Sequence, residues 1–80
     1  MEEIMRTYIQ ALQSQIARNS AEITLRERMI RFSYEELKAD NREDCWLPCI
    51  IADKKHLVTL VKNQKALKKL LGELILFENY

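Results

Sequence analysis

Apolar residues recur every seven positions along the first half of the chain. The recurring residues are Ile9, Ile16, Ile23, Ile30 and Leu37. A seven-residue repeat is typical of a helix that packs along another helix, with a second row of contacts beside the first. The second row consists of Met5, Leu12, Asn19, Arg26 and Ser33, and is apolar only near the N-terminus. This pattern predicts one long α-helix over about residues 2–39.

A second heptad pattern follows in the last third of the chain. Its apolar members are Leu57, Leu60, Leu67, Leu71 and Leu74, with Gln64 as a polar exception. Asp53 precedes them and is a suitable N-cap, so we expect a return helix over about residues 53–77. Two endings stay open: Gly72 ends the helix in a left-handed C-cap, or the helix continues through Gly72 at a cost of about 1 kcal/mol. In the first case the tail, residues 73–80, is extended; in the second it begins as the last turn of the helix.

The stretch between the two patterns reads as a connection over residues 40–52. Four charges and an asparagine interrupt the repeat from Asp40 to Asp44. Pro48, the single proline, lacks a backbone donor and disfavours helical geometry at Leu47. The sequence therefore predicts an all-α hairpin whose two helices are antiparallel.

Unequal helix lengths leave part of the first helix uncovered in this scheme. A helix over residues 2–39 is about 57 Å long, whereas one over residues 53–71 is about 28 Å. The uncovered segment is expected to form an oligomer or partner interface made of Met5, Tyr8, Ile9, Leu12, Ile16 and Asn19. Self-association as a coiled coil or as a four-helix bundle of two hairpins covers it equally well.

One alternative fold breaks the first helix. Asn19-Ser20-Ala21-Glu22 has the spacing of a capping box, and a break there gives a compact three-helix bundle. Against it, Ile16 and Ile23 keep one heptad frame across the site. In a continuous helix, Asn19 and Arg26 are polar residues in the packing row, and we interpret them as devices that fix partner and register. Leu25, Met29 and Phe32 form a separate apolar set that widens the buried surface.

Composition supports a single helical domain. The 80 residues are 48% hydrophobic and 31% charged, with one glycine and one proline, too few for the turns of a β-sandwich. The N-terminus has no basic and apolar signal segment, and the longest apolar runs are far too short to span a bilayer, so we expect a cytoplasmic protein.

Cys45, Cys49 and His56 are weak candidates for a metal site. Thiolate and imidazole are ligands that zinc prefers, but the C-x3-C spacing is uncommon and a fourth ligand is missing. We favour reduced thiols buried near Trp46 and expect no bound metal or cofactor. No triad, glycine-rich loop or paired carboxylates suggest an enzyme.

Lysines dominate the second helix. Six of them lie between residues 54 and 69 without an intervening acid, and Lys62, Lys65 and Lys69 share one helical face suited to a polyanion.

Elimination leaves two hypotheses about function. The first is a small, non-enzymatic protein–protein interaction module that is homo-oligomeric and acts on another protein as adaptor, inhibitor or small chaperone. The alternative is an accessory protein that binds nucleic acid through the lysine face. The first is favoured because the lysine face lacks arginine forks and interleaved aromatic residues for stacking on bases.

Overall fold

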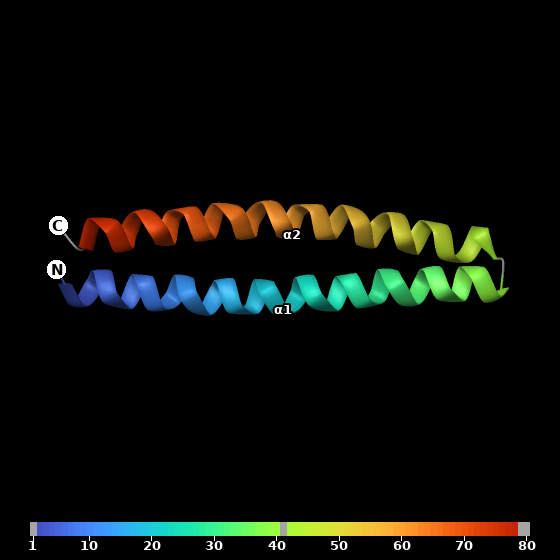
Figure 1. The fold of residues 1–80 in the computed structure, drawn as a ribbon, viewed down its shortest axis with the longest axis horizontal. Coiled ribbons are helices and arrows are strands. Elements are labelled where there is room, and N and C mark those ends of the chain that lie inside the picture. The colour runs from blue at the N-terminus through green and yellow to red at the C-terminus, as the bar shows by residue number, and fades with distance from the viewer. Residues whose placement is uncertain (1, 41, 79–80) are drawn as a thin grey trace.

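Two long helices make up the whole fold (Figure 1). The structure, a computed structural model, describes residues 2–40 and 42–78. Helix α1 spans Glu2–Asp40 and helix α2 spans Glu43–Glu78. They run antiparallel, so Glu2 and Glu78 lie at one end and the connection at the other, in a rod of 58 × 15 × 13 Å. The predicted all-helical hairpin is confirmed; Asn79 and Tyr80 of the predicted tail lie outside the described residues.

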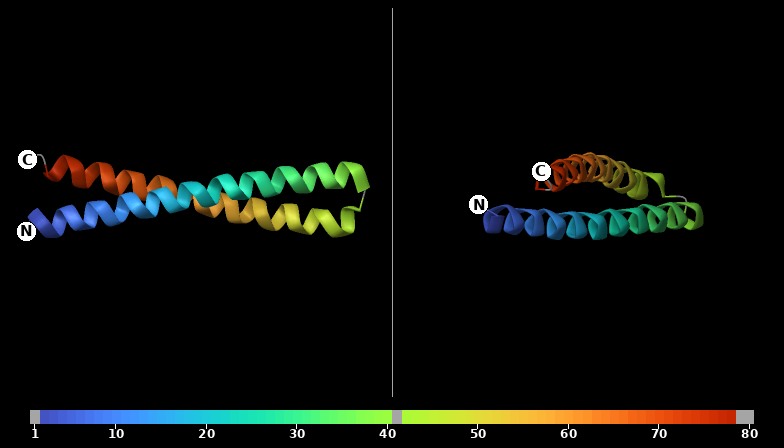
Figure 2. Two further views of the ribbon diagram at one scale, coloured as in Figure 1. Left: turned by 90° about the horizontal axis from the view of Figure 1, so that it is seen from below. Right: turned by 60° about the vertical axis from the view of Figure 1, so that its left-hand side comes forward.

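The helices contact each other along a seam that keeps heptad spacing from end to end. On α1 its members are Met5, Ile9, Leu12, Ile16, Asn19, Ile23, Arg26, Ile30, Ser33 and Leu37. On α2 they are Trp46, Ile50, Asp53, Leu57, Leu60, Gln64, Leu67, Leu71 and Leu74. All are buried or half-buried, at alternating spacings of three and four residues. The two helices cross at mid-length (Figure 2, left), as expected for ridges of one helix packing into grooves of another.

Helix α2 begins ten residues before the predicted start. The prediction of a connection over residues 40–52 and of Asp53 as N-cap is wrong: only two positions separate the helices, and Asp53 lies inside α2. The first turn closes through hydrogen bonds from the backbone N–H of Cys45 and of Trp46 to the carbonyl of Arg42, at 3.1 and 3.0 Å. Glu43 and Asp44, interpreted from the sequence as helix-breaking charges, occupy that turn and complement the helix dipole.

Pro48 lies in the second turn of α2 without ending the helix. It removes the hydrogen bond that residue 48 would otherwise donate to the Asp44 carbonyl. Packing outweighs that loss because Trp46 and Ile50 extend the heptad rows backward from Asp53. Ile50 is only 2% exposed, the lowest value among the described hydrophobic residues.

The longer α2 reaches the free end of α1 and covers it. The prediction that Ile9 and Leu12 lack an intrachain cover is therefore wrong: they are 7% and 5% exposed. Met5, Ile16 and Asn19 are half-buried in the same seam, and Tyr8 alone of the predicted interface set stays exposed.

Both uncertainties about helix continuity are resolved. Helix α1 continues through Asn19 and Ser20, so the three-helix alternative is wrong. Helix α2 continues through Gly72, where an added Cβ meets nothing within 4 Å, so the helical ending is correct.

A two-helix fold encloses no core on all sides. None of the described side chains is fully buried, and the Cα radius of gyration is 17.9 Å, against about 12 Å for a compact domain of this length. Each seam residue is therefore covered only by the facing helix, and the seam is open to solvent along both of its sides.

Candidate interaction surface

Two polar layers interrupt the apolar seam at mid-length. In the first, Asn19 Nδ2 donates to the Leu60 carbonyl and to Gln64 Oε1, both at 3.2 Å, and Gln64 Nε2 donates to the Ile16 carbonyl at 3.0 Å. Gln64 is buried, and its amide is paired on both its donor and its acceptor side. Asn19 and Gln64 therefore lie opposite each other and are hydrogen-bonded. A shift of α2 along α1 would break this pair.

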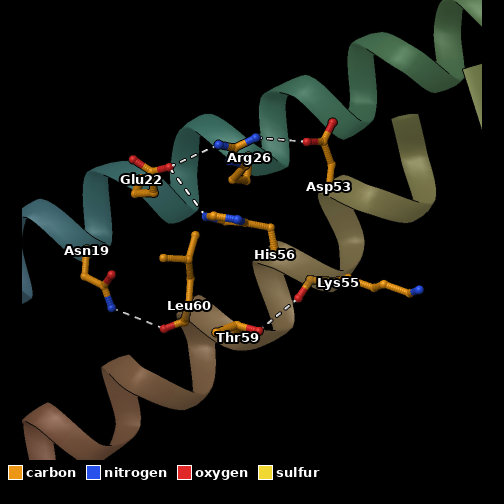
Figure 3. A network of polar contacts seen from close by, with 8 residues as sticks. All are labelled: Asn19, Glu22, Arg26, Asp53, Lys55, His56, Thr59 and Leu60. Atoms are coloured by element: carbon orange, nitrogen blue, oxygen red, sulfur yellow. Dashed lines mark hydrogen bonds and ion pairs between the residues drawn. The ribbon is translucent and has the colours of Figure 1, made fainter. Parts of the chain in front are cut away.

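The second polar layer is ionic (Figure 3). Arg26 Nη1 donates to Asp53 Oδ1 at 3.0 Å, and Nη2 lies 3.4 Å from Glu22 Oε1. The Arg26 and Asp53 side chains are 26% and 12% exposed, so their charges are largely shielded from water. Glu22 Oε1 also lies 3.8 Å from His56 Nε2, which places both residues on one flank of the seam.

Two grooves open on that same flank. The larger, about 590 Å³, is lined by Arg28, Met29, Phe32, Ser33, Trp46, Cys49, Ala52 and Asp53. The smaller, about 270 Å³, is lined by Gln15, Asn19, Asn63, Ala66, Leu67 and Leu70. Gln15, Glu22 and Met29 form one heptad row of α1, which runs along the row of Cys49, His56, Asn63 and Leu70 on α2. The Glu22–His56 contact lies between the grooves and joins them into one surface, here called the grooved face.

Large apolar side chains of α1 stand beside small residues of α2 on this face. Leu25, Met29 and Phe32 are 51%, 40% and 56% exposed. Phe32 contacts Trp46 edge-on, with ring centroids 6.2 Å apart at 81°. The larger groove exists because Cys49 and Ala52, opposite these side chains, are too small to fill the space.

Charge is concentrated away from the α2 side of the grooved face. Its two heptad rows on α2 start at Cys45 and at Cys49. Before Glu73 they carry no aspartate, glutamate, lysine or arginine, and their one basic side chain is the imidazole of His56. All six lysines of α2 fall outside these rows. Lys62, Lys65 and Lys69 are exposed, and among the described residues none has an ion-pair partner. The predicted polyanion site is thus spatially separate from the grooved face.

The opposite flank of the seam carries a cation–aromatic pair and apolar residues of α2. Lys54 Nζ donates to the Tyr34 hydroxyl and lies 4.9 Å from the ring centroid, so this pair bridges the helices near the connection. Ile51, Val58 and Val61 are exposed there, but all three belong to α2. The facing rows of α1 are mainly polar, with Arg6, Gln13, Ser20, Thr24, Glu27 and Arg31.

The candidate metal ligands do not gather into a site. No group of three or more His, Cys, Asp or Glu residues in the described part of the chain is placed to hold a metal. Cys45 and Cys49 are free and exposed, so the prediction that they are buried near Trp46 is wrong. The side chain of His56 is near Glu22 instead.

Fold and surface together define an antiparallel helical hairpin with a polar-interrupted seam and one grooved, weakly charged face. Comparisons with protein-family models, with curated proteins and with solved structures find no match. Neither described helix has the length and apolar character needed to cross a membrane.

Proposed function

We propose that this chain is a non-enzymatic protein–protein interaction module that self-associates and presents its remaining surface to another protein, as adaptor, inhibitor or small chaperone. The observation that carries the proposal is the exposure of large apolar side chains from both helices on one grooved face. Isolated exposed hydrophobic residues are ordinary on a monomer, but a contiguous group beside a groove is typical of an interaction site.

Self-association supplies the direct test. We expect light scattering on a sizing column to give a molar mass of at least twice 9.5 kDa at micromolar concentration. The mass should fall toward that of one chain on dilution, because association follows mass action. A mass of 9.5 kDa at every concentration up to the millimolar range would contradict self-association.

A second candidate function uses the lysine face. Lys62, Lys65 and Lys69 are exposed and unpaired among the described residues, as a phosphate-binding surface requires. Binding to a generic duplex should weaken steeply with salt, and replacing all three by glutamate should abolish it. Glutamate at Arg6, Arg31 and Lys38, which are exposed on α1, changes the net charge equally and is the matched control. Absence of binding at low salt would eliminate this function.

A further inference from the structure

We propose that the grooved face docks a second copy of this chain, end over end, so that two hairpins form a four-helix bundle with their connections at opposite ends. The inference rests on the proposed self-association and specifies its face, its occupant and its orientation.

The area of the hairpin supports a second copy as the occupant. The chain exposes 6504 Å², whereas a compact monomer of 9.5 kDa exposes about 5,000 Å². The excess is about 1,500 Å² per chain, and two chains that each bury it form an interface of about 3,000 Å². That value lies within the range of obligate homodimers, about 2,000 to 5,000 Å².

The distribution of apolar residues selects the grooved face. Tyr8, Leu25, Met29 and Phe32 of α1 and Leu70 of α2 are exposed on it, so both helices contribute to one layer. On the opposite flank the exposed large apolar residues come from α2, except for Tyr34 of α1, which contacts Lys54 near the connection. The other residues in the facing rows of α1 are mainly polar. A bundle interface takes apolar side chains from every helix. On the opposite flank Tyr34 is the one exposed large hydrophobic residue that the described part of α1 contributes, so the grooved face fits this requirement better.

The charges at mid-length select the orientation. Arg18 and Glu22 lie on the grooved face of α1, two positions either side of residue 20. A twofold axis at the level of residue 20, perpendicular to the rods, places Glu22 against the partner's Arg18. It also places Phe32 against the partner's Tyr8, since these positions lie twelve residues either side of residue 20.

The other face-to-face arrangement leaves Arg18 without an ionic partner. With both connections at one end, α1 lies against the partner's α2. The α2 rows on the grooved face have no acidic side chain before Glu73. Arg18 would then lose water without gaining an ionic partner, which disfavours this arrangement.

Matched glutamate variants test the face. Leu25 on the grooved face and Val58 on the opposite flank are 51% and 54% exposed, so glutamate at either site leaves the seam of the hairpin intact. We expect L25E to raise the dimer dissociation constant on the order of a hundredfold, because it buries an unpaired carboxylate, and V58E to change it little. Circular dichroism should show the same helix content in both. A dimer that resists L25E, or one lost equally in both variants, overturns the assignment of the face.

Crosslinking tests the orientation. In a background with Cys45→Ser and Cys49→Ser, we introduce Tyr8→Cys and Phe32→Cys together and treat the protein with a short bifunctional maleimide. Within one chain these positions are about 36 Å apart along α1, so only an interchain link is within reach. We expect a covalent dimer from the double variant and none from either single variant. A covalent dimer from Tyr8→Cys alone, or none from the pair, overturns the end-over-end arrangement.

The two failures are distinguishable. A monomeric parent chain contradicts both the proposed function and this inference. A dimer that fails the Leu25 or crosslinking test contradicts the inference alone, since the chain then self-associates through another surface.

Discussion

Replacing Asp53 by alanine should lower the free energy of unfolding by about 2 to 3 kcal/mol. Asp53 accepts a 3.0 Å hydrogen bond from Arg26, and both side chains are largely shielded from water. The variant keeps the Arg26 charge in the seam and removes its shorter ionic contact. Urea denaturation followed by circular dichroism, at one fixed protein concentration, measures the change.

Glu22→Ala is the control for this prediction. Glu22 also contacts Arg26, but at 3.4 Å and with its side chain 40% exposed, so we expect a loss of about 0.5 kcal/mol or less. The double variant Arg26→Leu with Asp53→Leu should recover most of the stability, because it removes both charges from the seam. Equal losses for Asp53→Ala and Glu22→Ala would contradict the assigned role of Asp53.

Replacing Pro48 by alanine should raise the free energy of unfolding by about 2 kcal/mol. A proline in a helix interior costs about 3 kcal/mol relative to alanine, and about 1 kcal/mol of the gain is offset by the greater freedom of the unfolded chain. The substitution restores the donor for the Asp44 carbonyl in the second turn of α2. Thermal denaturation at fixed concentration measures the effect.

Lys62→Ala serves as the control, since Lys62 is exposed in the interior of the same helix. We expect its effect to stay within about 0.5 kcal/mol. A Pro48→Ala variant less stable than the parent chain would mean that the proline ring supplies packing at the start of α2, contrary to the prediction.

The heptad pattern predicted most of the fold. It placed α1 within one residue of its ends and identified the leucine rows of α2 correctly. It failed at residues 43–52, where the local effects of Pro48 and of the charges at residues 40–44 favoured a turn. Trp46 and Ile50 continue the heptad frame through that segment, but their packing is decided by a helix distant in sequence, which local propensity does not report.

The surface was predictable on α1 and not on α2. Leu25, Met29 and Phe32 form a visible apolar set, and Asn19 and Arg26 are visible as polar residues in an apolar row. The sequence does not show which residues of α2 they pair with. Asp53 is interpreted from the sequence as an N-cap and not as the partner of Arg26. The alignment of the two helices, and with it each cross-helix pair, depends on where α2 begins. Cys49 and Ala52 give no periodic apolar signal, so the larger groove becomes visible only when both helices are placed side by side.

The short connection also has a consequence for how the hairpin folds. Contacts next to the connection close the smallest loops: Phe32 and Trp46 are 14 positions apart, whereas Asn19 and Gln64 are 45 apart. Closing the larger loop first costs about 1 kcal/mol more, so pairing that starts at the aromatic contact and proceeds toward the termini is favoured. The two polar layers are then reached in sequence, the Arg26–Asp53 layer before the Asn19–Gln64 layer. A chain that has paired one heptad out of step meets unmatched polar groups there, which favours reopening over continued pairing.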